Sequence, residues 1–226
     1  MNSKYRYEIK FVLNDIQLSE ISAWMNAETS MIKRYSPRII NNLYFDDADF
    51  SSVKDNLSGI SNRKKYRLRW YGESVEDFQP VFEIKGRNDR VGFKTVFDIK
   101  DLNGRIHTLM PSEILQICTH TLQEKEYILD NFLFPTLQVK YLRSYFEDHQ
   151  GIRLTIDHDI NFSLPSLHES LLENISRPYP MKIVELKFNP TEKDKVSELI
   201  GSLHLRPKRH SKYLAGLASL GLAQYI

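Results

Sequence analysis

The sequence predicts an α+β fold in which antiparallel strands form a closed β-barrel tunnel with a charged interior, and helices pack against its outside. Three observations support this prediction. Several segments alternate apolar and charged residues with a period of two, as half-buried strands do. In six of them the charged positions carry both signs and are rich in Lys and Arg. A few other segments show the spacing of amphipathic helices.

The predicted strands are distributed along the whole chain. They cover residues 5–13, 41–45, 64–71, 81–87, 92–99, 137–146, 152–157 and 183–188. In the first strand Tyr7, Ile9 and Phe11 alternate with Glu8 and Lys10. Successive side chains of a strand point to opposite faces, so each of these segments has one apolar face and one charged face.

Helical spacing predicts four helices, at residues 16–25, 111–131, 191–201 and 211–220. Pro111 suits the first turn of the second helix, where a missing N–H costs nothing. Loops are predicted at residues 46–47, 56–62, 72–80 and 163–180. The last of these contains three prolines and is interpreted as a lid or a partly ordered insertion.

Length and composition limit the possible functions. The 226 residues fit one large domain, and we predict a single domain over residues 1–226. A net charge of +2 does not mark a general nucleic-acid binder. The lone Cys118 rules out an internal disulfide and is expected in the core. The sequence has no apolar leader and no run of about 18 apolar residues, so we expect a cytoplasmic protein with no membrane segment.

A Glu-x-Lys pattern recurs on three predicted strands, where it places a carboxylate beside an ammonium group on one face. The pairs are Glu8 with Lys10, Glu83 with Lys85, and Glu185 with Lys187. An open antiparallel sheet with one solvated face would also show such a pattern. In a closed barrel the cations would repel one another, and a triphosphate or polyphosphate would neutralise them. The carboxylates would then hold a divalent metal.

These motifs, in this order, resemble the VTC domain family of the triphosphate tunnel metalloenzyme superfamily, which is CYTH-like. The segments that carry the resemblance are RYEIKF at residues 6–11, LYFDD at 43–47, KYRLRWYG at 65–72, FEIK at 82–85, YLR at 141–143, RLTID at 153–157, VELK at 184–187 and RHSKY at 209–213. They span nearly the whole chain.

The resemblance implies a metal-dependent polyphosphate polymerase, an ATP-dependent phosphotransferase that moves the γ-phosphate of ATP to a growing polyphosphate chain. Its partners would be ATP and polyphosphate, without nucleic acid. The implied catalytic residues are Lys10, Arg67, Arg69 and Glu185. The implied substrate-binding residues are Lys85, Lys94, Tyr141, Arg143, Arg153, Lys187, Arg209, Ser211 and Lys212. Glu185 and Glu83 would bind the metal, Mn²⁺ or Mg²⁺, with Glu8 as a supporting group.

One departure from the superfamily separates two of the candidate functions. Hydrolytic members often begin with Glu-x-Glu-x-Lys, whereas Arg6 occupies the first carboxylate position here. The VTC branch is therefore favoured over a triphosphate hydrolase, and a non-catalytic phosphate-binding module stays open. Asp157 alternates with Arg153 and is expected in a structural ion pair. Polymerase subunits of eukaryotes also carry membrane helices, so any coupling to a membrane is expected to be absent here or to be supplied by a partner.

Overall fold

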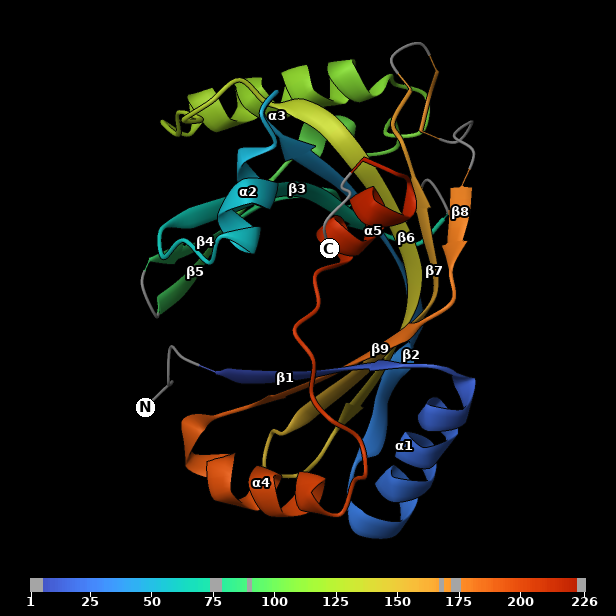
Figure 1. Ribbon diagram of the computed structural model, residues 1–226. Coiled ribbons are helices and arrows are strands. Elements are labelled where there is room, and N and C mark those ends of the chain that lie inside the picture. Colours follow the sequence, from blue (N-terminus) through green and yellow to red (C-terminus); the bar gives the residue numbers. More distant parts are fainter. Residues whose placement is uncertain (1–5, 74–78, 89–90, 167–168, 172–175, 223–226) are drawn as a thin grey trace. The chain divides into compact units, whose positions relative to one another are not determined.

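The computed structural model describes residues 6–73, 79–88, 91–166, 169–171 and 176–222. Figure 1 shows its helices and strands in chain order. They are β1 (Tyr7–Leu13), α1 (Asp15–Glu28), β2 (Ile32–Asp46), α2 (Ser51–Leu57), β3 (Arg63–Tyr71), β4 (Val81–Asn88), β5 (Val91–Asp98), η2 (Lys100–Leu102), α3 (Pro111–Glu124), β6 (Phe134–Glu147), β7 (Arg153–Ser163), β8 (Ser176–Tyr179), β9 (Lys182–Phe188), η3 (Pro190–Glu192), α4 (Lys193–Gly201) and α5 (Lys212–Ser219).

The strands form one sheet in the order β1-β9-β7-β6-β2-β3-β4-β5, and β8 pairs with β7. The pairs β1–β9, β7–β9, β2–β3, β3–β4 and β4–β5 are antiparallel. The predicted mixture of helices with an antiparallel sheet is confirmed. The predicted closure of the barrel is not confirmed. Within the described ranges the strand path is open, since no pairing joins its end strands β1 and β5.

The chain divides into two compact units, each built from separate segments. The first unit contains Met1–Arg38, Tyr141–Ile160 and Tyr179–Ser211, and the second contains Ile39–Lys140, Asn161–Pro178 and Lys212–Ile226. Strands β2, β6, β7 and β8 each contribute residues to both units. The single domain expected over residues 1–226 stays a prediction.

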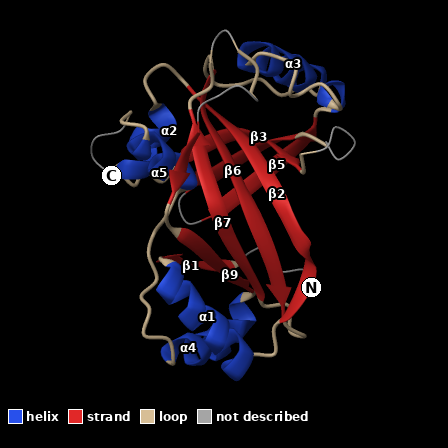
Figure 2. Cartoon of the chain, turned by 90° about the vertical axis from the view of Figure 1, so that its right-hand side faces the viewer, coloured by secondary structure: helices blue, strands red, loops and turns tan. Residues whose placement is uncertain are grey.

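In the first unit, α1 and α4 cover one face of β1 and β9 (Figure 2). Asn14 caps α1, because its Oδ1 accepts a hydrogen bond of 2.9 Å from Gln17 N. Trp24 of α1 packs with Phe11 and Leu186 in the core and donates its Nε1–H to Leu199 O at 3.0 Å. Because side chains alternate, the residues between these apolar positions point to the other face of both strands.

In the second unit, helices pack on both faces of the sheet. The core under α3 contains Leu43, Trp70, Phe82 and Cys118, all fully buried, so the expected burial of the cysteine is confirmed. On the other face, Tyr213 of α5 stacks on the ring of Tyr44 with 5.0 Å between the centroids, and its hydroxyl donates to Asp46 Oδ2 at 2.8 Å.

The structure differs from the predicted elements at several places, and three of the differences have a local physical reason. Strand β2 begins nine residues earlier than the predicted segment 41–45. Its first seven residues are exposed and therefore carry no apolar alternation. Helix α3 ends at Glu124, short of the predicted residue 131, and Glu126 just beyond it has the left-handed φ of 58°. Helix α2 was not predicted, because it is short and lacks a side-chain cap. Strand β8 lies inside the predicted loop at residues 163–180.

Substituting Gly216 on α5 by Ala should destabilise the protein by about 1–3 kcal/mol, since a Cβ there would lie 2.5 Å from Leu137 Cδ2 and 2.8 Å from Phe162 Cδ1. This crowding outweighs the helix preference of Ala, about 1 kcal/mol. Urea unfolding measures the change. Gly201→Ala at the end of α4 is the matched control, because nothing lies within 4 Å of its added Cβ. Equal stabilities for the two variants would contradict the packing of α5.

Candidate functional site

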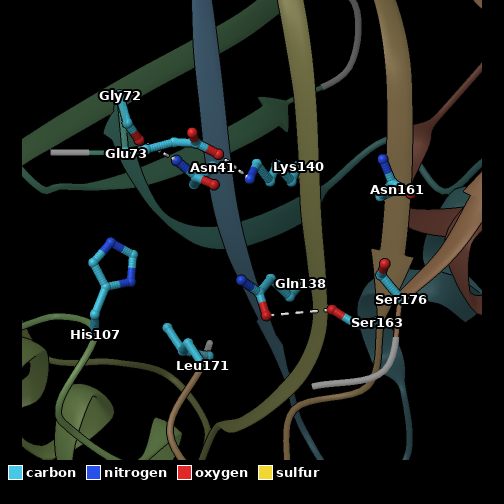
Figure 3. Close-up of a pocket in the computed structure, with 10 residues that line it drawn as sticks. All are labelled: Asn41, Gly72, Glu73, His107, Gln138, Lys140, Asn161, Ser163, Leu171 and Ser176. Atoms are coloured by element: carbon cyan, nitrogen blue, oxygen red, sulfur yellow. Dashed lines mark hydrogen bonds and ion pairs between the residues drawn. The ribbon is translucent and has the colours of Figure 1, made fainter. Parts of the chain in front are cut away.

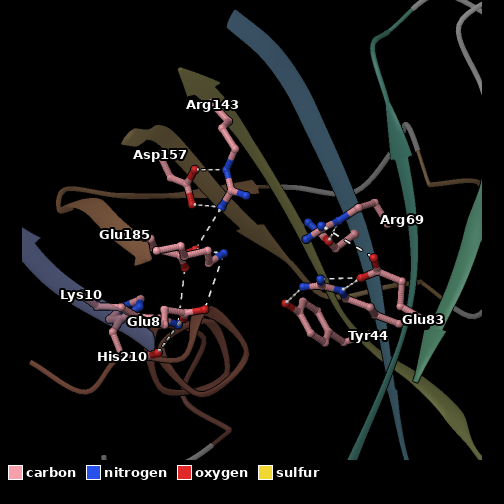
Figure 4. Close-up of polar contacts among 12 residues, drawn as sticks. Glu8, Lys10, Tyr44, Arg69, Glu83, Arg143, Asp157, Glu185 and His210 are labelled. Atoms are coloured by element: carbon pink, nitrogen blue, oxygen red, sulfur yellow. Dashed lines mark hydrogen bonds and ion pairs between the residues drawn. The ribbon is translucent and has the colours of Figure 1, made fainter. Parts of the chain in front are cut away.

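The first charged cluster lies in the first unit and is centred on Glu185 (Figure 4). Lys10 Nζ lies 2.8 Å from Glu8 Oε1 and 3.4 Å from Glu185 Oε1. Lys187 Nζ lies 3.0 Å from Glu185 Oε2 and 3.5 Å from Glu8 Oε2. Two lysines therefore bridge the same two carboxylates. We call these residues, with Arg143 and Asp157, the Glu185 cluster.

Strand register explains why these residues meet. In the β1–β9 pair Lys10 lies opposite Glu185, and Glu8 lies opposite Lys187. Each Glu-x-Lys motif is thus matched with the other in reverse order, so every charge has an opposite charge beside it and across from it. The contacts predicted within the motifs Glu8-x-Lys10 and Glu185-x-Lys187 are confirmed.

Attraction between opposite charges keeps Glu8 and Lys10 of the Glu185 cluster ionised. Burial and the nearby Glu185 push the pKa of Glu8 upward, but Lys187 and Lys10 outweigh them, so this pKa lies below its ordinary value. Burial lowers the pKa of Lys10, yet Glu185 and Glu8 outweigh it and raise this pKa above its ordinary value. Both groups therefore remain charged at neutral pH.

Arg143 of β6 joins the cluster to Asp157 of β7. Its Nε donates to Asp157 Oδ1 at 2.5 Å and its Nη2 donates to Oδ2 at 2.7 Å, while Nη2 also lies 3.7 Å from Glu185 Oε2. Burial opposes the charge of Arg143, but Tyr141, Asp157 and Glu185 raise its pKa well above the ordinary value. The expected ion pair of Asp157 is therefore present, with Arg143 as its partner.

The segment between α4 and α5 lies against the same cluster. Lys208 N donates to the backbone oxygen of Lys10 at 2.8 Å, and Lys10 Nζ donates to His210 O at 3.3 Å. The ring of His210 is 3.3 Å from the hydroxyl of Tyr179. This segment therefore adds a backbone N–H, a backbone oxygen and the ring of His210 to a site otherwise built on strands.

The second charged cluster lies in the second unit and is centred on Glu83 of β4 (Figure 4). Arg67 Nε donates to Glu83 Oε2 at 2.6 Å, Arg69 Nη1 lies 3.9 Å from Oε1, and Lys94 forms an ion pair with Oε1. Tyr44 and Asn42 of β2 orient the arginines: Arg67 Nη1 donates to Tyr44 Oη at 3.2 Å and Arg69 Nε to Asn42 Oδ1 at 3.0 Å. We call these residues the Glu83 cluster.

A row of lysines borders the Glu83 cluster. Lys65 of β3 lies opposite Lys85 of β4, which lies opposite Lys94 of β5. Like charges directly opposite each other in a sheet are destabilising. Lys65 shares its face with Arg67 and Arg69, because the three alternate with buried residues of β3. Lys85 and Lys94 share this face through the strand register. This face therefore places three lysines beside Arg67 and Arg69.

The cations around Glu83 determine its ionisation. Glu83 is 2% exposed, and burial alone would raise its pKa. Arg67 and Arg69, followed by Lys94, outweigh burial and lower the pKa of Glu83 to about 2. Glu83 is thus a permanent anion that orients three cations.

A separate cavity of about 380 Å³ lies in the second unit (Figure 3). Asn41, which lines it, alternates with Asn42 and so points to the opposite face of β2 from the Glu83 cluster. The cavity is lined by Asn41, Gly72, Glu73, His107, Gln138, Lys140, Asn161, Ser163, Leu171 and Ser176. None of the predicted site residues lines it.

The predicted site residues divide between the two units. Lys10, Arg143, Lys187 and Glu185 meet in the Glu185 cluster, with Tyr141 beside Arg143, whose guanidinium carbon lies 5.4 Å from the tyrosine ring centroid. Arg67, Arg69, Lys94 and Glu83 meet in the Glu83 cluster, with Lys85 in the adjoining row. Arg153 pairs with Glu147 at 2.9 Å. Arg209 is exposed, and Ser211 and Lys212 lie where the chain enters α5.

Two residues that orient the arginines were missed by the sequence analysis. Asn42 and Tyr44 alternate with the buried Leu43 and Phe45, which was the signal available. An amide and a phenol carry no charge, so the search for charged faces overlooked them. The structure identifies them through the hydrogen bonds that they accept from the arginines.

Comparison with known families and proteins agrees with these motifs. The VTC domain family matches residues 5–221. Subunit 2 of the vacuolar transporter chaperone complex of Saccharomyces cerevisiae is 24% identical over 276 aligned residues, which cover 98% of this chain and 33% of that protein. The chain thus spans about a third of the length of this relative.

Solved structures share the fold at low sequence identity. A putative adenylyl cyclase from Hippeastrum, described as having a dominant triphosphatase activity, has a TM-score of 0.56 and 12% identity, covering 95% of this chain and 96% of that one. A protein from Pyrococcus horikoshii has a TM-score of 0.52 and 14% identity, covering 96% and 99%. A putative adenylate cyclase from Vibrio parahaemolyticus has a TM-score of 0.51 and 12% identity, covering 94% and 98%.

A Glu83→Gln variant should be less stable than the wild type at neutral pH by about 3 kcal/mol, because three cations lose their shared anion. The folded-state pKa of Glu83 is below its ordinary 4.5. Its contribution is therefore complete above that value and is lost as the pH falls toward about 2. Urea unfolding between about neutral pH and about pH 3 should show the difference shrinking. A difference independent of pH would contradict the assignment, and the exposed Glu20→Gln is the control.

An Asp157→Asn variant should lose about 3–5 kcal/mol of stability, because the buried Arg143 guanidinium loses its bidentate partner. Asp157 is fully buried, whereas the side chain of Asp159 is 74% exposed, so Asp159→Asn is the matched control. Thermal or urea unfolding measures both variants. A double variant, Asp157→Asn with Arg143→Met, should recover part of the loss, and its failure to do so would argue against a dominant role for this pair.

Proposed function

The chain belongs to the VTC domain family, and on this premise we propose that it is an ATP-dependent polyphosphate polymerase. It would transfer the γ-phosphate of ATP to the end of a growing polyphosphate chain. The observation that carries the proposal is the lysine row Lys65, Lys85 and Lys94, which adjoins the Glu83 cluster. A sheet that holds like charges opposite one another has a face suited to a polyanion.

The residues of both clusters suit phosphoryl transfer. Arg67 and Arg69 present planar guanidinium groups, which bind phosphate oxygens through paired hydrogen bonds, while the lysines act as point charges. An oxygen of the acceptor phosphate attacks the γ-phosphorus, and the bond from that phosphorus to the bridging oxygen of ADP breaks. This reaction needs positioning and charge neutralisation and no protein nucleophile.

The carboxylates of the two clusters differ in their suitability for a metal. Glu185 and Glu8 are two oxygen donors close together, and a Mg²⁺ or Mn²⁺ ion held there would neutralise charge between phosphate groups. Among the described residues no group of three or more His, Cys, Asp or Glu is arranged to hold a metal, so phosphate oxygens and water would complete its shell. Glu83 shares its three cations with no second carboxylate in the ion pairs of the described residues, so it suits an ion-pair role better than the predicted metal role.

One further function would use the same residues. The described triphosphatase activity of the Hippeastrum protein favours hydrolysis as a second candidate.

The relative from Saccharomyces cerevisiae is a subunit of a complex, so we also infer that this chain works with partner subunits. Within the described ranges no helix has the length and apolarity needed to cross a bilayer.

Purified protein incubated with ATP and Mn²⁺ should produce long-chain polyphosphate, measured separately from orthophosphate. Glu185→Gln and Lys10→Ala should each reduce chain growth by about 100-fold or more, because the first removes a carboxylate ligand of the proposed metal and the second removes a cation that would contact the transferring phosphate. Glu20→Gln on α1 is the control for Glu185→Gln and should retain activity. Release of orthophosphate without chain growth would instead identify a hydrolase, and phosphate binding without turnover would identify a binding module.

A further inference from the structure

We propose that an exposed basic segment of β2 binds the part of a polyphosphate chain that extends beyond the Glu185 cluster. The segment consists of Lys33, Arg34, Tyr35 and Arg38, and we call it the β2 basic segment. The inference rests on the proposed function, since it needs a phosphate chain at the Glu185 cluster. It adds a second binding site for the same ligand, outside the residues that the family motifs mark.

The β2 basic segment carries concentrated positive charge. All of residues 32–38 are exposed, and three of them are cations. In the described part of the chain, no carboxylate forms an ion pair with Lys33 or Arg38. Arg34 Nε lies 3.6 Å from Glu147 Oε2. Of these three cations only Arg34 has a carboxylate partner among the described residues, and that carboxylate, Glu147, is also paired with Arg153.

The carboxylate of Glu147 connects the segment to the Glu185 cluster. Arg153 Nε donates to Glu147 Oε1 at 2.9 Å, so Arg34 and Arg153 share the same carboxylate. Arg153 lies opposite Lys187 in the β7–β9 register, and Lys187 belongs to the Glu185 cluster. All these residues are in the first unit. A series of cations therefore leads from Lys187 through Arg153 to Arg34 and Arg38.

The aromatic group in the segment favours a phosphate chain over nucleic acid. The guanidinium carbons of Arg34 and Arg38 lie 5.8 and 5.3 Å from the centroid of the Tyr35 ring, and the ring of Tyr145 meets it edge-on at 5.9 Å. Proteins that bind single-stranded nucleic acid stack bases on aromatic rings. Here guanidinium groups already cover the tyrosine, which arranges the arginines to present donors to phosphate oxygens.

The segment contributes little to the stability of the fold. Its side chains are exposed, and exposed ion pairs contribute at most about 1 kcal/mol. The three charges can therefore be removed without unfolding the protein. These exposed like charges are concentrated in one segment and contribute little to the stability of the fold. An anionic ligand would explain why they are there.

The test compares two triple variants that remove the same number of positive charges. One is Lys33→Gln with Arg34→Gln and Arg38→Gln. The control is Lys54→Gln with Lys100→Gln and Arg105→Gln, all exposed and in the second unit. Titration measures the affinities for tripolyphosphate, long-chain polyphosphate and a single-stranded RNA homopolymer at several salt concentrations. The single variant Lys33→Gln is the second test, for use if the triple variant loses its folded circular-dichroism spectrum.

We expect the β2 variant to bind tripolyphosphate as the wild type does, within about twofold, and long-chain polyphosphate at least about tenfold more weakly. Its slope of log affinity against log salt should fall by about two. Lys33→Gln should weaken long-chain binding about threefold, and the control variant should change neither affinity. An unchanged long-chain affinity would overturn the inference and leave the proposed function intact. RNA binding as tight as polyphosphate binding would also overturn it, while failure of the wild type to bind either phosphate chain would refute the proposed function itself.

Discussion

Repulsion between cations held at the spacing of neighbouring strands is the constraint on which the charged face depends. The registers that place Lys65, Lys85 and Lys94 in one row are the same registers that bury Trp70 and Phe82 on the other face. The register cannot change for one face alone, because a shift of one residue would move the lysines to the apolar face and the apolar residues to the charged face. The apolar core beneath α3 therefore stabilises a surface that is unfavourable by itself.

The two clusters differ in the ratio of carboxylates to cations. The Glu185 cluster contains three carboxylates, Glu8, Asp157 and Glu185, and three cations, Lys10, Arg143 and Lys187. Its charges balance without a ligand. In the Glu83 cluster the ion pairs among the described residues join three cations to one carboxylate, a ratio that favours an anionic ligand. The phosphate ligand would have to compete with carboxylates in the first cluster and would meet excess cations in the second.

Neutral residues and backbone groups set the geometry of the charged ones. Tyr44 both orients Arg67 and stacks on Tyr213, so the packing of α5 bears directly on the position of an arginine. In the first unit, Lys10 is held through its own backbone and side chain by the segment that carries Lys208 and His210. The arginine and lysine side chains are therefore positioned before any ligand binds, which limits the entropy lost on binding.

The period-two alternation alone determined which residues share a face, because the geometry of a strand is local. It correctly placed Glu8 with Lys10 and Arg67 with Arg69, and the order of the motifs indicated the family. The alternation did not determine which oppositely charged side chains form ion pairs. Arg153 was expected near Asp157 on the same strand, yet Asp157 pairs with Arg143 across the β6–β7 turn and Arg153 pairs with Glu147. Strand partners and register arise from contacts between distant segments, so only the tertiary structure decided the ion pairs, the division into two clusters and the open strand path.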